Sequence, residues 1–182
     1  MSLLFGDRAT FAIELEIPAD QPDPFSGLCP MVHLTYWIAG REIGDPELAT
    51  YAGYAEDGLR HHLADRGHRR DDGLYALPAS ELIALLDSCY NDPALAERAT
   101  TERWSAHSIG RPLDRSEYLE DLQTGWTVHL VEDERTGRVL AYRRAAPAEV
   151  IEGRILPGEV DGALAAAWNA MQALLEPDPQ TD

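Results

Sequence analysis

Hydrophobic and polar side chains alternate over several short stretches of the chain, and each such stretch predicts a β-strand with one buried face. The alternation is clearest at residues 10–17, where the apolar set comprises Phe11, Ile13, Leu15 and Ile17. Residues 31–38 are apolar on both faces, which is typical of a strand in the middle of a sheet. Ala39-Gly40 predicts a turn, after which residues 41–43 pair back onto that strand.

A second group of alternating stretches lies towards the C-terminus. Residues 126–131 and 138–144 flank Thr136-Gly137, and this arrangement predicts a hairpin. Residues 149–156 alternate again. We therefore expect a three-stranded meander in this region.

Apolar positions at helical spacing follow the first group of strands. Asp45-Pro46 is typical of the cap and first residue of a helix. The expected buried stripe of this helix contains Leu48, Tyr51, Ala52, Ala55, Leu59 and Leu63. Gly53 and Gly58 weaken this helix and could bend it, and Gly67 suits its left-handed C-terminal position.

Three further elements complete the predicted order. A short strand is expected at residues 74–77, and Ser80 is expected to cap a second helix. Asp161 is expected to cap a last helix whose inner face contains Leu164, Ala167, Trp168, Met171, Leu174 and Leu175.

The element order predicts an α+β fold. We expect a single domain over residues 1–176, with a mostly antiparallel sheet of about five to six strands and three or four helices packed on it. Residues 177–182 are rich in proline and acidic side chains, and they are expected to form a disordered tail.

Charge narrows the possible partners. The formal net charge is −17, from 15 basic and 32 acidic residues. This excess opposes binding to nucleic acids and to anionic membranes, and it favours a basic protein partner. The N-terminus has no apolar stretch typical of a signal peptide, and no apolar run has the length of a membrane span. We therefore expect a cytoplasmic protein with reduced thiols.

The acidic residues are clustered in predicted loops and on helix faces. Between residues 114 and 134, seven acidic residues accompany one basic residue, a local net charge of −6. The candidate partner-binding residues are Glu56, Asp57, Asp71, Asp72, Glu117, Glu120, Asp121, Glu132, Asp133 and Glu134. They could attract a basic protein, or they could only form a solvated rim that keeps the protein soluble.

Signals for enzyme chemistry are weak. His61, Asp65 and His68 have a spacing that could place three metal ligands on one helical face. Gly67, however, is expected to end the helix before His68, and neighbouring arginines repel a cation. The alternative is a polar helix end that complements the helix dipole.

The remaining candidates favour structural roles. His33 and His129 lie in predicted strands, where a core histidine is more common than a catalytic one. Cys89 lies on an apolar helical stripe, and Cys29 has no base near it in the sequence. No phosphate-binding glycine loop, nucleophile elbow or zinc-protease motif is present. The sequence therefore predicts no catalytic residue, metal or cofactor, and a small metal-dependent hydrolase or a non-catalytic adaptor stays as the alternative.

Four stretches, in order along nearly the whole chain, carry a family resemblance: Phe5–Glu16, Tyr36–Leu48, Trp126–Glu132 and Leu156–Asp161. Together they resemble the immunity protein 42 family of bacterial polymorphic toxin systems. The resemblance implies a cytosolic protein that binds and neutralises a cognate toxin, without catalytic residues or a cofactor.

Residues 57–112 match the family least, so partner specificity is expected to vary there. That the toxin is a basic nuclease is a further hypothesis, which rests on the net charge of −17. The sequence does not indicate an oligomeric state.

Overall fold

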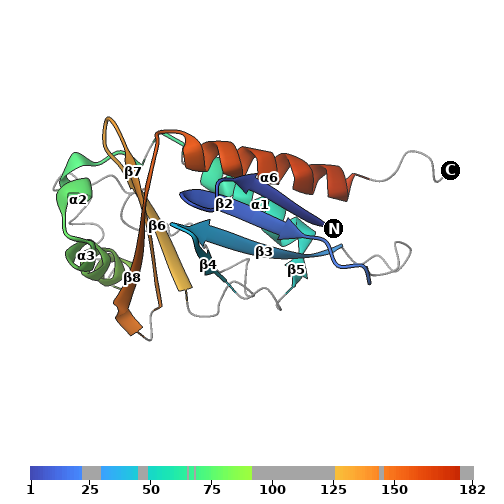
Figure 1. The fold of residues 1–182 in the computed structure, drawn as a ribbon, viewed down its shortest axis with the longest axis horizontal. Coiled ribbons are helices and arrows are strands. Elements are labelled where there is room, and N and C mark those ends of the chain that lie inside the picture. The colour runs from blue at the N-terminus through green and yellow to red at the C-terminus, as the bar shows by residue number, and fades with distance from the viewer. Residues whose placement is uncertain are drawn as a thin grey trace.

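The computed structural model describes residues 1–21, 30–44, 49–64, 66–67, 69–91, 126–143 and 146–176 (Figure 1). One antiparallel sheet contains β1 (Ser2–Gly6), β2 (Phe11–Glu16), β3 (Met31–Ile38), β4 (Arg41–Ile43) and β5 (Thr50–Tyr51). A second antiparallel sheet contains β6 (Trp126–Glu132), β7 (Gly137–Arg143) and β8 (Ala146–Ile155). The helices of the described ranges are α1 (Ala52–Ala64), α2 (Asp72–Ala76), α3 (Ala79–Asn91) and α6 (Glu159–Leu175). The predicted α+β class is therefore confirmed.

The five-stranded sheet is built around β3, as its two apolar faces predicted. β2 pairs with one side of β3, while β4 and β5 pair with the other side near its two ends. Phe11, Ile13 and Leu15 of β2 are fully buried on the inner face. The helices α1 and α6 cover this face, and α6 runs along the sheet beside β1 and β2 (Figure 1).

The edge strand β1 was not predicted. Its sequence, Ser-Leu-Leu-Phe-Gly, lacks a clean alternation of polar and apolar residues. β1 pairs along its whole length with β2, from Ser2 opposite Glu16 to Gly6 opposite Ala12. Pairing with an established strand supplies the signal that the local pattern lacks.

The second sheet contains the predicted hairpin and meander, with Glu132 opposite Gly137 and the turn at residues 133–136. Its two faces are both buried. One face joins the core of the first sheet through Trp126, Val128, Leu130, Val139, Ala141, Ile151 and Ile155. The other face packs with α2 and α3 through Leu74, Leu82, Ile83, Val131, Leu140 and Tyr142.

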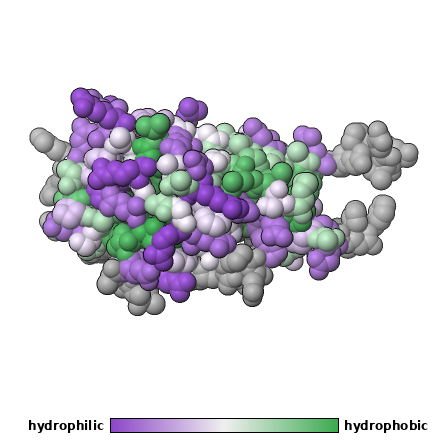
Figure 2. Space-filling view, in the orientation of Figure 1, coloured by the Kyte–Doolittle hydropathy of each residue, from purple (hydrophilic) through white to green (hydrophobic). Residues whose placement is uncertain are grey.

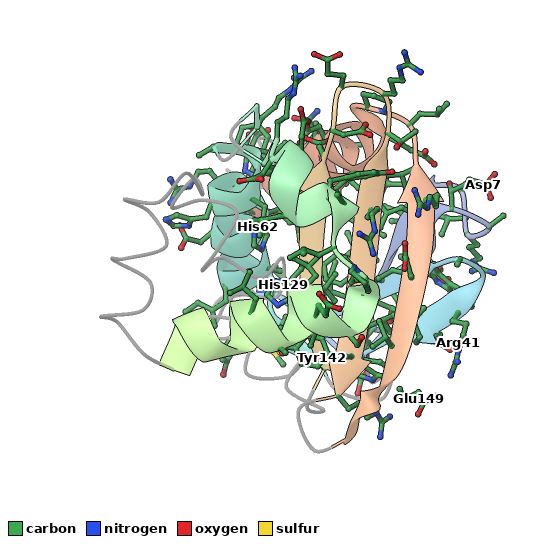
Figure 3. All side chains as sticks on the ribbon, turned by 90° about the vertical axis from the view of Figure 1, so that its left-hand side faces the viewer. Asp7, Arg41, His62, His129, Tyr142 and Glu149 are labelled. Atoms are coloured by element: carbon green, nitrogen blue, oxygen red, sulfur yellow. The ribbon has the colours of Figure 1, made fainter. Side chains whose placement is uncertain are left out.

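The strands therefore form two sheets around a shared core, and the expectation of one sheet of five to six strands was wrong in this respect. Alternation shows which residues share a face of a strand, but it does not show which strands pair. The two sheets are also linked at the surface, where the Arg41 guanidinium lies 3.1 Å from the Glu149 carboxylate (Figure 3).

The start of α1 differs from the prediction. Strand β5 at Thr50–Tyr51 precedes the helix, whose first residue is Ala52. The Ala52 amide donates to the carbonyl of Pro30 at 2.7 Å, so it bonds the residue that precedes β3 rather than a preceding helical turn. Tyr51, which was expected in the buried stripe, is 40% exposed. The expected cap at Asp45-Pro46 lies outside the described residues.

The rest of α1 follows the expected pattern. Ala52, Ala55 and Leu59 are buried, and the helix continues without a break through its two glycines. Gly67 has the predicted left-handed conformation, with φ of +79°.

Three other predicted boundaries are corrected. The expected strand at residues 74–77 is instead the short helix α2, because the Asp71 side chain accepts a bond from the Leu74 amide at 2.9 Å and caps a helical turn. Ser80 lies inside α3, one residue after its start. Asp161 lies inside the first turn of α6, after Gly158 at the cap position. No helix in the described ranges combines the length and apolar character needed to span a membrane.

Candidate functional site

Acidic residues from two distant segments meet at the turn between β6 and β7. The segment before α2 runs parallel to the end of β6, where the Glu132 amide donates to the Arg69 carbonyl at 3.0 Å. The Asp71 amide donates in turn to the Glu132 carbonyl at 2.9 Å. We call the resulting surface the hairpin-tip acidic face, and it consists of Asp71, Asp72, Glu132, Asp133 and Glu134. Figure 2 shows hydrophilic side chains projecting from the end of the molecule where this hairpin turns.

Two of these carboxylates shape the backbone. Asp71 caps α2. Asp133 accepts bonds from the amides of Arg135 at 2.7 Å and Thr136 at 2.6 Å, and these donors lower the pKa of the Asp133 carboxyl. Both side chains therefore hold the face in shape, in addition to adding negative charge.

Two other carboxylates face solvent. The side chains of Asp72 and Glu134 are 69% and 70% exposed. Arg70 lies between them, 2.5 Å from Glu134 and 3.8 Å from Asp72. Five carboxylates against Arg70 and Arg135 leave a formal charge of −3 on this face.

The remaining candidates in the described ranges lie elsewhere. Glu56, on α1, accepts a bond from the indole of Trp168 on α6 at 2.5 Å. Asp57 pairs with Arg60 and with His61 on its own helix. Asp57 lies seven residues before the end of α1, about 10 Å along the helix axis. Glu117, Glu120 and Asp121 lie outside the described residues.

The metal hypothesis gains no support from the described residues. The His61 Nδ1 atom lies 2.8 Å from the Asp57 carbonyl and 3.3 Å from its carboxylate. Asp65 and His68 are outside the described ranges, and within them no group of three or more His, Cys, Asp or Glu residues could hold a metal ion.

The strand histidines are placed as structural residues. His129 is 6% exposed, and its ring stacks on Tyr142 at 5.8 Å between centroids. Figure 3 shows both residues on the side of the second sheet that α3 covers. His33 lies opposite Glu16 in the pairing of β2 with β3 and is partly buried. Cys29 is outside the described residues.

Comparison with known proteins identifies the family of this chain. The model of the family described as immunity protein 42 matches residues 1–170. The chain belongs to the immunity protein 42 family. This immunity protein binds and neutralises a cognate toxin, as the resemblance of its sequence implied.

A solved structure has the same fold. The crystal structure of CdiI from Burkholderia dolosa aligns with a TM-score of 0.66 and 17% sequence identity. The alignment covers 92% of the immunity protein and 99% of the CdiI chain. A search of curated proteins gives no match.

The basic residues that organise the acidic face of the immunity protein were not predicted. From the sequence, Arg69 and Arg70 were interpreted as charges that repel a metal ion or complement the dipole of the preceding helix. In the structure Arg69 is 4% exposed, and it pairs with Asp161 at 2.6 Å. These two residues are 92 positions apart. A single sequence carries no signal that Arg69 and Asp161 form an ion pair. The position of Arg69-Arg70 directly before Asp71-Asp72 indicates only that these neighbouring charges could pair with one another.

Glu132 provides a pH-dependent test of the site. Burial raises the pKa of its carboxyl above the ordinary 4.5, while Arg69 lowers it and Asp161 raises it further. A raised folded-state pKa means that the protonated side chain favours folding below the ordinary pKa. This contribution is lost as the pH rises through the folded-state pKa. We therefore expect Glu132→Gln to be as stable as the natural protein at about pH 4 and more stable at pH 7.

The measurement is urea unfolding of both proteins at the two pH values. The difference in unfolding free energy between the two proteins at each pH cancels the titration of the groups that they share. Glu134→Gln, which removes an exposed charge of the same sign, is the matched control. If Glu132→Gln were less stable than the natural protein at pH 7, although equal to it at pH 4, attraction to Arg69 would outweigh burial.

Proposed function

We propose that the immunity protein recognises its toxin through the hairpin-tip acidic face, and that the toxin presents a basic surface to it. The observation that carries the proposal is the pairing of Arg69–Asp71 with Glu132. This pairing brings carboxylates from two segments about 60 residues apart onto one surface. Inhibition then needs binding alone, and no residue of the immunity protein is assigned a catalytic role.

The exposed groups on this face suit recognition of cations. Asp72 and Glu134 present carboxylates that are more than two-thirds exposed, and Arg70 holds them at defined positions. A lysine or arginine of the toxin could pair with them and displace Arg70 from Glu134. Charge complementarity of this kind increases the association rate and discriminates against other partners.

The scaffold under the face is well fixed. The Tyr75 hydroxyl of α2 hydrogen-bonds the Thr136 hydroxyl at the hairpin turn. Arg138 of β7 donates to the carbonyls of Tyr75 and Leu77 at 2.5 and 2.7 Å. Binding residues presented by such a rigid scaffold lose little conformational freedom when the complex forms.

The charge of the whole chain favours one class of toxin. Nucleases present basic surfaces to nucleic acid, and an immunity protein with a net charge of −17 could occupy such a surface. We include a nuclease toxin and a cytosolic site of action in the proposal. Tight binding to a toxin without nuclease activity, insensitive to salt, would contradict this part.

The charge-reversal variant Asp72→Lys/Glu134→Lys tests the binding face. The probe is the toxin domain encoded by the gene upstream, identified first by its toxicity to cells that lack the immunity protein. We expect the association rate at low salt to fall about 10- to 100-fold, because attraction to a basic surface becomes repulsion. Stopped-flow association at several salt concentrations measures it, and the natural protein should show the steeper salt dependence.

The matched control is Glu16→Lys/Glu42→Lys. Both residues are exposed on the five-stranded sheet, and this variant also changes the net charge from −17 to −13. It should slow association less than the first variant. Equal slowing by both would assign the effect to overall charge, and no slowing by either would refute the acidic face as the toxin-binding site.

A further inference from the structure

One buried charged side chain, that of Arg69, joins the segment that carries Asp71 and Asp72 to the helices α1 and α6. Arg69 donates from one guanidinium nitrogen to the Asp161 carboxylate at 2.6 Å and from another to the His62 carbonyl. Its backbone carbonyl accepts from the amide of Glu132. Arg69 thus joins the end of α1, the first turn of α6 and the edge of β6 at a single point.

The inward orientation of the Arg69 side chain is coupled to the outward orientation of the side chains beside it. The segment is extended here and forms a bridge with Glu132, so successive side chains project to opposite sides. Arg69 is 4% exposed and points inwards, whereas the Arg70 side chain is 50% exposed and reaches Glu134. A shift of Arg69 would therefore move Arg70 and Asp72 away from the hairpin.

Stability alone does not account for a pair of this kind. Buried ion pairs contribute little net stability, because desolvation of both charges offsets their attraction. The Asp161 carboxylate is also 3.5 Å from the more exposed Arg66, so both of its oxygens have cationic partners. Such directional contacts fix the position of a segment more strictly than apolar packing does.

We infer that Arg69 and Asp161 are positioning residues for toxin recognition: their ion pair holds the Arg70–Asp72 segment against Glu132, so that Asp72 and Glu134 meet the toxin as one surface. The inference rests on the proposed function of the hairpin-tip acidic face. It extends that face inwards to Asp161, in the first turn of α6.

The test is the variant Arg69→Met/Asp161→Met, which removes one positive and one negative charge and leaves the net charge at −17. Long-range attraction to the toxin is then unchanged, so any slower association reports on geometry. We expect the association rate with the upstream-encoded toxin domain to fall about threefold to tenfold, with overall unfolding stability nearly preserved. Hydrogen exchange at the Asp71 and Glu132 amides should accelerate about tenfold, while exchange at Leu15 and Leu34 stays unchanged.

A second variant covers the case in which the double variant does not fold. Asp161→Asn keeps the shape of the side chain and weakens the pair, and Glu42→Gln is its control with the same change of charge. Asp161→Asn should slow association more than Glu42→Gln does. Equal rates for the two single variants, or an unchanged rate in the double variant, would overturn the inference and leave Arg69 a purely structural residue.

These outcomes are separable from those of the proposed function. If Asp72→Lys/Glu134→Lys slows association and Arg69→Met/Asp161→Met does not, only the positioning role of Arg69 and Asp161 is refuted. If the charge reversal has no effect, the proposal that the hairpin-tip acidic face binds the toxin is refuted.

Discussion

Replacing Arg138 by methionine is expected to lower the free energy of unfolding by about 3–5 kcal/mol, because it removes one partner of a buried ion pair. The Arg138 side chain is 4% exposed and donates to Glu152 at 2.9 Å. It also supplies the donor for the carbonyls of Tyr75 and Leu77. Methionine fills a similar volume but leaves these three acceptors without that donor. Urea denaturation followed by circular dichroism measures the loss.

Arg154→Met is the matched control. Arg154 contacts two of these three residues, with its guanidinium 2.7 Å from the Tyr75 hydroxyl and 3.6 Å from Glu152, but its side chain is 65% exposed. Exposed pairs contribute less than about 1 kcal/mol, so this variant should remain close to the natural protein. Equal losses in the two variants would show that burial of Arg138 is not what makes its contacts important.

Gly6→Ala is expected to be the second severe substitution. Gly6 ends β1 with φ of +99°, and an added Cβ would lie 2.4 Å from the Phe11 carbonyl oxygen. That oxygen accepts from the Asp7 amide at 3.0 Å, so the backbone of the turn would have to move. Left-handed strain of about 1–2 kcal/mol and overpacking of about 1–3 kcal/mol together predict a loss of about 2–5 kcal/mol in unfolding free energy.

Gly40→Ala separates the two causes. Gly40 also has a positive φ, +78°, but nothing lies within 4 Å of its added Cβ. Only the strain of about 1–2 kcal/mol should remain. Thermal and urea unfolding measure both losses of unfolding free energy. Equal losses for the two variants would show that the contact of the added Cβ with the Phe11 carbonyl oxygen does not destabilise the fold.

The fold was predictable wherever a strand pairs with its neighbour in sequence. The hairpin formed by β6 and β7 and the turn after Ile38 were predicted because alternation and turn residues lie within a few positions of each other. Strand β1 and the division into two sheets depend on pairing choices that local patterns do not encode. The short helix α2 was missed because the cap at Asp71 outweighs the extended propensity of the residues that follow it.

The candidate site was predictable only in its parts. Asp71-Asp72 and Glu132–Glu134 were both identified as acidic clusters, but their meeting depends on a bridge between Arg70 and Glu132. Glu56 and Asp57 belong to the same predicted set but lie elsewhere. Glu56 bonds Trp168 of α6, and Asp57 pairs with Arg60 on its own helix. Charge in a sequence shows the number of carboxylates, whereas burial and pairing decide which of them can meet a partner.

The electrostatics of the chain act at two ranges. The formal charge of the hairpin-tip acidic face is only −3, a small part of the total of −17. The total charge therefore sets the long-range attraction that brings a basic partner close. The local pairs of Arg70 with Asp72 and Glu134 set the geometry of contact. Specificity for one toxin is expected to depend on the second effect more than on the first.

The placement of α6 has a consequence for synthesis on the ribosome. This helix covers the inner face of strands that are translated far earlier, and its Asp161 also holds Arg69. At about 5–20 residues per second, synthesis from the end of β4 to the end of α6 takes roughly 7–26 s. During this interval Phe11, Ile13 and Leu15 lack one of the two helices that cover them, and Arg69 lacks its ion-pair partner Asp161. A nascent chain is therefore expected to give the cell no protection until α6 has emerged from the exit tunnel.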